Sequence, residues 1–213
     1  MGRFVLGVGG GSGAPYMRRV FEGLLLGGHE VHVVISEAGR KVSAIESDLH
    51  VTGDPRSDAA AIRSWLGEAG GSGSVRVYAL NDFEAPIASG SFKTDGMAVV
   101  PCSMAALGRI AHGTGSNLLE RAADVALKER RSLVLVPREM PLSLIHLRNM
   151  VAAVEAGAEI VPAMPGFYHR PRSIQDLIDS VAGRVLDRLG VDAHFLRRWT
   201  GPIPAELSAL EDR

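Results

Sequence analysis

Short apolar runs alternate with amphipathic segments along most of this chain. Between the runs, apolar residues recur at helical spacing, as at Tyr16, Val20 and Leu24. Strands that alternate with helices in this way predict an α/β fold built on a parallel sheet. The six runs that have the length of a strand are residues 4–8, 31–35, 75–78, 97–100, 133–136 and 159–162.

The run at residues 133–136 is the clearest of the six, because it is apolar without interruption. Such a run is typical of a strand buried on both faces, so we expect it in the centre of the sheet. Pro137 cannot continue a central strand, and the chain therefore leaves the sheet there and presents Arg138 and Glu139. Open α/β sheets bind ligands at the carboxyl ends of their strands, so this pair favours chemistry on an anion.

A glycine-rich loop, residues 9–15, follows the first strand and precedes a helix. Its backbone N–H groups and the helix dipole favour a phosphate group. The loop lacks the Gly-Lys-Ser/Thr of a Walker A motif, and it fits the dinucleotide fingerprint only loosely, with Gly9, Gly11 and Ala14. The second strand ends in Ser36 instead of the acidic residue that binds an adenosine ribose, so FMN fits better than NAD.

Two residues of this pattern have simpler interpretations. Residues 10–14 approximate the nucleophile elbow of hydrolases, but Ser12 also fits the N-cap of the next helix, which is compatible with phosphate binding. Cys102 has no visible base, so we expect a buried residue without a catalytic role.

The irregular segment 81–92 is expected to be a binding loop.

Composition narrows the class of protein. The chain has 213 residues, 46% of them hydrophobic, which suits one α/β domain and not two. A net charge of -1 offers no overall field for nucleic acid or an anionic membrane, so we expect neither partner. A single cysteine excludes an internal disulfide, and the scattered histidines predict no metal site. Without a signal peptide or a run of 18 apolar residues, we expect a soluble, cytoplasmic protein.

Eight short stretches of the chain form a specific set of motifs: residues 10–14, 88–91, 101–104, 121–131, 133–139, 141–143, 145–147 and 166–169. Together they resemble the UbiX/Pad family of flavin prenyltransferases along nearly the whole chain. The resemblance implies a Rossmann-like (flavodoxin-like) doubly wound parallel sheet in a three-layer sandwich, with an FMN-binding domain at residues 1–190. It leaves residues 191–213, with Trp199, as an arm on the domain or on a neighbouring subunit.

The resemblance also implies a reaction and an assembly. Reduced FMN would accept the dimethylallyl group of dimethylallyl monophosphate, and UbiD-type decarboxylases, as in ubiquinone biosynthesis, would use the prenylated FMN. Family members are usually dodecamers with active sites at subunit contacts, so we expect a homo-oligomer. No metal is implied.

Residue roles carried over from the family fall into three groups. FMN would be held by Gly10, Gly11, Ser12, Ser36, Ser103, Met104, Ala105, Ala106 and Arg138. The substrate phosphate would be bound by Arg121, Lys128, Arg138, Tyr168 and Arg184. The catalytic residues would be Glu139, which moves a proton to the leaving phosphate, with Lys128, Ser12 and Glu46, the last in a supporting proton-transfer role.

The chain departs from the family pattern at a few positions, and two rival functions are open. Gly11, residues 104–106 and Arg148 stand where the family commonly has Ala, a Ser/Thr-rich turn and Glu. The first rival is an FMN-dependent cysteine decarboxylase, but residues 87–91 lack the asparagine-containing segment of those enzymes. The second is a non-catalytic FMN-binding subunit, which has no evident need for Lys128, Glu139, Tyr168 and Arg184 together.

Overall fold

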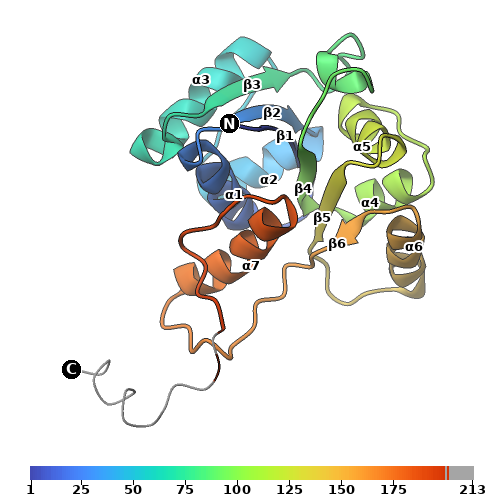
Figure 1. The fold of residues 1–213 in the computed structure, drawn as a ribbon. Coiled ribbons are helices and arrows are strands. Elements are labelled where there is room, and N and C mark those ends of the chain that lie inside the picture. The colour runs from blue at the N-terminus through green and yellow to red at the C-terminus, as the bar shows by residue number, and fades with distance from the viewer. Residues whose placement is uncertain (200, 202–213) are drawn as a thin grey trace, which may run out of the picture.

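A single parallel sheet forms the centre of the molecule (Figure 1). The computed structural model describes residues 1–199 and residue 201. All strand pairs are parallel, in the order β3-β2-β1-β4-β5-β6. The strands are β1 (Arg3–Val8), β2 (Glu30–Ile35), β3 (Ser74–Tyr78), β4 (Gly96–Cys102), β5 (Ser132–Pro137) and β6 (Glu159–Ile160). The predicted six-stranded α/β sheet is confirmed.

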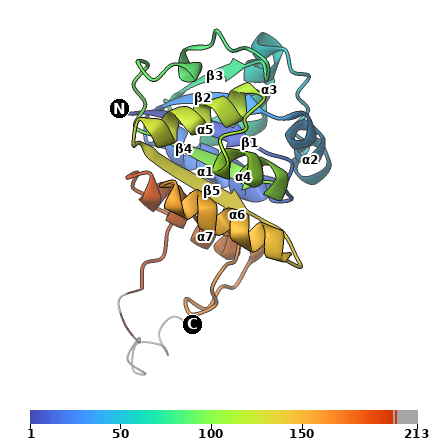
Figure 2. The ribbon, with the colours of Figure 1, turned by 90° about the vertical axis from the view of Figure 1, so that its right-hand side faces the viewer.

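Helices cover both faces of this sheet, as Figures 1 and 2 show. One face carries α1 (Ala14–Leu26), α3 (Pro55–Leu66) and α7 (Ile174–Arg188), and the other carries α4 (Met104–Ala111), α5 (Leu118–Lys128) and α6 (Leu144–Glu155). The remaining elements are α2 (Glu37–Ser47) and the 3-10 turns η1 (Gly67–Gly70) and η2 (Pro86–Ala88). This is the doubly wound, three-layer arrangement expected from the sequence. None of the helices described is long and apolar enough to cross a bilayer.

The uninterrupted apolar runs follow from this architecture. Successive side chains of a strand point to opposite faces, and both faces here are covered. In β1, Leu6 and Val8 belong to the core beneath α1 and α7, whereas Val5 belongs to the core beneath α4 and α5. Fully burying an aliphatic side chain contributes about 1.5–3 kcal/mol to stability, so both cores select apolar residues.

Three strand predictions need correction. The strand predicted at residues 97–100 continues through Cys102, which pairs with Pro137 after an irregularity in the β4–β5 register. The strand predicted at 159–162 has only two residues, because it pairs with β5 alone and lies at the sheet edge. β5 was expected in the centre of the sheet. It has a neighbour on each side, but β1 and β4 form the centre.

The strand order reverses between β1 and β4, and open α/β sheets have a binding crevice outside the carboxyl ends of the strands at such a point. The chain moves outward from β1 to β3 and then returns to build β4 to β6 on the other side, and ligands bind where the order reverses. At this point Gly9 donates its N–H to the carbonyl oxygen of Pro101 at 2.9 Å. A Cβ atom on Gly9 would lie 2.7 Å from that oxygen, so the close approach of the two loops requires glycine.

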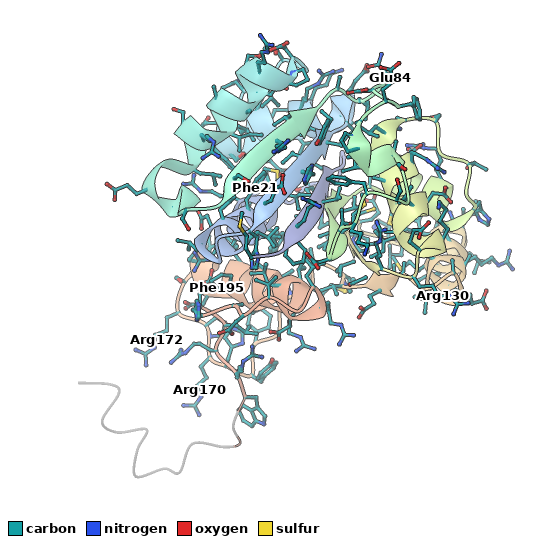
Figure 3. The ribbon with its side chains drawn as sticks, turned by 45° about the horizontal axis from the view of Figure 1, so that its top comes forward. Phe21, Glu84, Arg130, Arg170, Arg172 and Phe195 are labelled. Atoms are coloured by element: carbon teal, nitrogen blue, oxygen red, sulfur yellow. The ribbon has the colours of Figure 1, made fainter. Side chains whose placement is uncertain are left out.

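The beginning of the C-terminal arm lies against its own domain. Val191 and Ala193 are buried, and the guanidinium of Arg19 in α1 lies 3.8 Å from the ring centroid of Phe195. Figure 3 labels Phe195 near α7. Arg198 donates to Asp187 of α7 at 3.0 and 2.8 Å. Residues 200 and 202–213 of the predicted arm lie outside the described residues.

Candidate active site

The floor of the crevice is built from loops that lead into α1, α2 and α4. Ser36 and Ser103 are the N-caps of α2 and α4: their hydroxyl oxygens accept the N–H groups of Gly39 at 3.0 Å and of Ala106 at 3.3 Å. Each helix start directs its unpaired N–H groups and its dipole toward the carboxyl edge of the sheet. The crevice therefore suits an anionic ligand.

Glu46 reaches this crevice from α2. Its carboxylate accepts the backbone N–H groups of Gly13 at 2.8 Å and Ala14 at 2.9 Å. The N-cap of α1 is Gly13, at a φ of 141°, and it provides no side-chain bond to the helix. The prediction that Ser12 is the N-cap was therefore wrong, because a carboxylate from another helix takes that role.

The environment of Glu46 favours its charged form. Partial burial acts to raise the pKa of Glu46, but the Ser12 hydroxyl, the N–H groups of Ala14 and Gly13 and the charge of Arg138 outweigh it. The pKa therefore lies below the ordinary value of a glutamate. Glu46 is a carboxylate at neutral pH, fixed between the glycine loop and Arg138.

We expect Glu46→Gln to lower the free energy of unfolding by about 0.5–1 kcal/mol at neutral pH. Hydrogen bonds to a charged acceptor are the stronger ones, but Glu46 is exposed and solvent screens its charge. The pKa of Glu46 is lower in the folded protein than in the unfolded chain, where a glutamate has a pKa of about 4.3. Its carboxylate therefore stabilises the fold at pH values above the unfolded pKa, and this contribution is lost as the pH falls through the folded-state pKa. The difference from wild type should therefore shrink in acid. Urea unfolding at neutral pH and in acid measures the free energy of unfolding of Glu46→Gln, with the exposed Glu68→Gln as control. Equal stability of both variants at neutral pH would contradict the role given to the Glu46 carboxylate.

Arg138 and Glu139 lie at the crevice, directly after β5, as the sequence predicted. The Nε of Arg138 donates to the carbonyl oxygen of Ser12 at 3.4 Å, which ties the end of β5 to the glycine loop. Glu139 is exposed, and its carboxylate accepts the backbone N–H of Met140 at 3.1 Å. A guanidinium thus lies beside Ser12 and Glu46, and the next residue carries an accessible carboxylate.

Lys128 and Arg121 lie elsewhere, on α5. Arg121 donates to the carbonyl oxygen of Ala88 at 3.1 Å, and Lys128, the last residue of α5, contacts Glu129 at 2.5 Å. Lys128 precedes β5 at the amino edge of the sheet, whereas Glu139 follows it at the carboxyl edge. Five steps of about 3.3 Å separate the ends of β5, so about 17 Å of strand lies between these two positions. They do not meet within one chain.

Tyr168 and Arg184 form a third group at the outer flank of the sheet. Both line a hollow of about 410 Å³ beside the edge strand β6, together with residues of the loop that follows it. Their side chains are accessible, since Tyr168 is 62% exposed and the Arg184 side chain 59%. The predicted phosphate-binding residues are thus divided among three places in one chain.

Two further predictions concern Cys102 and the segment 81–92. Cys102 is fully buried, as predicted, and burial raises the pKa of its thiol to about 12, which favours the neutral thiol at neutral pH. The irregular segment is tied to the end of α5, because Arg131 donates to the carbonyl oxygens of Gly90 at 2.6 Å and Phe92 at 2.8 Å. Its role as a binding loop remains a prediction.

A family model described as flavoprotein matches residues 2–186. The flavin prenyltransferase UbiX of Pseudomonas aeruginosa is 47% identical over 197 residues, which cover 92% of this chain and 93% of that relative. The chain belongs to the UbiX family of flavoproteins. The resemblance drawn from its short motifs is thereby confirmed.

Two solved structures of UbiX relatives share this fold closely. AnUbiX (PadA1), determined with FMN and dimethylallyl pyrophosphate, has a TM-score of 0.83 and 41% identity, covering 94% of this chain and 98% of that one. A dodecameric FMN-dependent UbiX-like decarboxylase of Escherichia coli O157:H7 has a TM-score of 0.81 and 38% identity, covering 93% of this chain and 100% of that one. The UbiX-family chain thus matches whole relatives and not a fragment of them.

Proposed function

We propose that this chain is a flavin prenyltransferase that joins the dimethylallyl group of dimethylallyl monophosphate to reduced FMN. The observation that carries the proposal is the position of Arg138 beside Ser12 and Glu46 at the crevice, with Glu139 next to it in the chain. A relative at 41% identity binds FMN and a dimethylallyl phosphate ester, which supports the same ligands here. The prenylated FMN would serve UbiD-type decarboxylases, in the cytoplasm.

The residues present fit an FMN phosphate. Glu46 already occupies two N–H groups at the start of α1, which leaves the starts of α2 and α4 for a second anion. The hydroxyl groups that the family commonly has after Ser103 are missing, but backbone N–H groups at a helix start serve a phosphate without them. FMN would be held by Gly10, Gly11, Ser12, Ser36, Ser103, Met104, Ala105, Ala106 and Arg138.

The chemistry asked of these side chains is mainly electrostatic. Breaking the allylic C–O bond releases phosphate, and negative charge grows on its oxygen atoms as the prenyl group moves to the flavin. Arginine and lysine groups fixed in advance stabilise that charge more as the bond breaks, which lowers the barrier. Glu139 donates or relays a proton to the leaving phosphate, and Ser12 and Glu46 support proton transfer beside the flavin.

A complete phosphate site requires more than one copy of the chain. Lys128 and Glu139 flank β5 at opposite edges of the sheet, so we infer that Lys128 completes the site of a neighbouring subunit. The UbiX-like relative from Escherichia coli forms a dodecamer, which supports a homo-oligomer of similar size. Arg121, Tyr168 and Arg184 then have positions from which a second or third subunit could supply them.

α6 offers a surface for this assembly. It is an outer helix in Figure 2, and four of its apolar side chains repeat at intervals of three and four residues while 45–60% exposed. Such a stripe is the seam along which helices pack against each other. About half of each side chain is already covered, so burying the remainder would contribute roughly 1 kcal/mol per residue. The four are Leu144, Leu147, Val151 and Val154.

We expect Leu147→Glu to reduce the assembly to smaller species, because a carboxylate would be buried in this apolar seam. An unpaired buried charge costs several kcal/mol, which is enough to break the contact. Prenylation should then fall by about tenfold or more, because the dissociated chains lack the residues that a neighbouring subunit supplies. Light scattering and phosphate release measure the two effects. Leu26→Glu is the matched control, since Leu26 is 55% exposed at the end of α1. An assembly of wild-type mass in Leu147→Glu would rule out α6 as a contact.

Release of inorganic phosphate tests the function against its rivals. Under anaerobic conditions, dimethylallyl monophosphate should release phosphate only when reduced FMN and the protein are both present. Dimethylallyl pyrophosphate, supplied in parallel, measures the preference for the donor. A cysteine decarboxylase would release carbon dioxide from a C-terminal cysteine instead, and a non-catalytic FMN-binding subunit would release neither product.

A further inference from the structure

The loop between β6 and α7 makes a tight turn with Tyr168 and His169 at its tip. The N–H of Arg170 donates to the carbonyl oxygen of Phe167 at 3.0 Å, and Arg170 has left-handed backbone with a φ of 51°. Figure 3 labels Arg170 on this loop. Because both side chains leave the same short turn, the direction of Tyr168 depends on how His169 is held.

Aromatic contacts join these side chains. The rings of Tyr168 and His169 meet edge to face, with centroids 5.5 Å apart and planes at 78°. Tyr168 makes a similar contact with Trp199, at 5.8 Å and 87°. Edge-to-face contacts are favourable but leave the turn free to shift as a unit, so the orientation requires a further anchor.

The Nε2 atom of His169 is buried and has no hydrogen-bond partner among the residues that the structure describes. His169 lines a cavity of about 30 Å³, which has room for a water molecule. The other residues that line it include Asp176, Asp179 and Ser180 of α7. An imidazole N–H that shares such a cavity with oxygen acceptors is suited to a bridging water.

The far wall of this cavity is fixed to the domain. Asp179 accepts hydrogen bonds from Arg19 of α1 at 2.8 and 3.2 Å and from Gln175 at 2.6 Å. The same Arg19 lies against the ring of Phe195, which also lines the cavity. A group bound to Asp179 is therefore held by two helices and by the start of the C-terminal arm.

We propose that His169 is a positioning residue for Tyr168. Its Nε2–H donates to a water in this cavity, and the water donates to the carboxylate of Asp179. This link holds the turn so that the Tyr168 hydroxyl remains at the hollow it shares with Arg184. The inference rests on the proposed function, in which Tyr168 and Arg184 bind the substrate phosphate. His169 itself touches neither substrate nor flavin.

The test compares His169→Phe with His169→Gln in the assembled protein. Phenylalanine keeps a ring against Tyr168 but removes the donor, so KM for dimethylallyl monophosphate should rise about tenfold, the worth of one buried hydrogen bond, with little change in kcat. Glutamine returns an N–H donor near the position of Nε2 and should restore most of the affinity. FMN affinity should be unchanged in both variants.

A double-mutant cycle asks whether His169 acts through Tyr168. In a Tyr168→Ala background, His169→Phe should change KM by less than about twofold, because the residue to be positioned is gone. A purely structural role of His169 would instead give no rescue by glutamine and an undiminished effect in that background. Wild-type KM in His169→Phe, or effects that multiply with Tyr168→Ala, would overturn the proposal.

A crystal structure of the wild-type protein provides a readout without turnover. We expect an ordered water between His169 Nε2 and Asp179, and an imidazole turned to solvent would overturn the link. If the wild-type protein releases no phosphate from dimethylallyl monophosphate, the proposed function fails, whereas this crystallographic test still decides whether the link exists.

Discussion

Glu139→Gln should slow prenylation by about a hundredfold or more, the usual contribution of a positioned acid or base, while FMN binds as before. Glutamine keeps the shape of the side chain and can still hydrogen-bond, but it cannot move a proton. Glu139 is exposed at the carboxyl end of β5, beside an arginine that faces the glycine loop, so the change should leave the fold intact. Phosphate release and FMN titration under anaerobic conditions measure the two quantities.

Glu68→Gln is a suitable control for this experiment, because it makes the same chemical change at an exposed position of η1, far along the chain from the crevice. Near-normal turnover in Glu139→Gln would mean that water or the phosphate itself supplies the proton. The catalytic role assigned to Glu139 would then have to be abandoned.

Lys128→Ala should lower kcat/KM for dimethylallyl monophosphate by about tenfold to a hundredfold, since a charge-assisted phosphate contact contributes about 1.5–3 kcal/mol. The loss should fall on both KM and kcat, because the lysine binds the phosphate before the reaction and stabilises its growing charge during it. Steady-state kinetics with saturating reduced FMN measures both constants. Lys93→Ala removes an exposed lysine near the amino edge of the sheet and serves as control.

Complementation between variants tests where this lysine acts. If Lys128 and Glu139 of one site come from different subunits, Lys128→Ala and Glu139→Gln chains assembled in equal amounts will form some sites with both residues intact. Random assembly should restore about a quarter of wild-type activity, although each variant alone is nearly inactive. Mixed assemblies no more active than the better single variant would show that both residues serve the same subunit's site.

The fold could be predicted from the sequence because four of its strands, β1, β2, β4 and β5, are buried on both faces. Runs such as residues 133–136 leave no polar alternation, and only a parallel sheet between helices uses them. The edge strand β6 was predicted too long: it pairs on one side only, and its residues are only half-buried. The last residues of β4 were missed because Pro101 was expected to end the strand. Pro101 lies where the β4–β5 register is irregular, and the strand continues to Cys102.

The candidate site was predictable by residue but not by arrangement. Motifs identified Lys128, Glu139 and Arg184 without their distances, although one signal was available: residues before and after the same strand must lie at opposite edges of the sheet. The contact of Glu46 with Gly13 could not be predicted, because 32 or more residues separate partners that only the packed fold brings together. Local patterns reveal elements, whereas a site assembled from distant elements needs their packing.

The mass of the flavin after turnover shows directly whether this protein prenylates FMN. Reduced FMN, dimethylallyl monophosphate and the purified assembly are incubated without oxygen, and the flavin is extracted and weighed by mass spectrometry, with Glu139→Gln as the matched control. We expect the wild-type sample to contain FMN that is heavier by one prenyl group, together with one released phosphate for each prenylated flavin. Unmodified FMN that is tightly bound by a well-folded wild-type assembly, with no phosphate released, would contradict it.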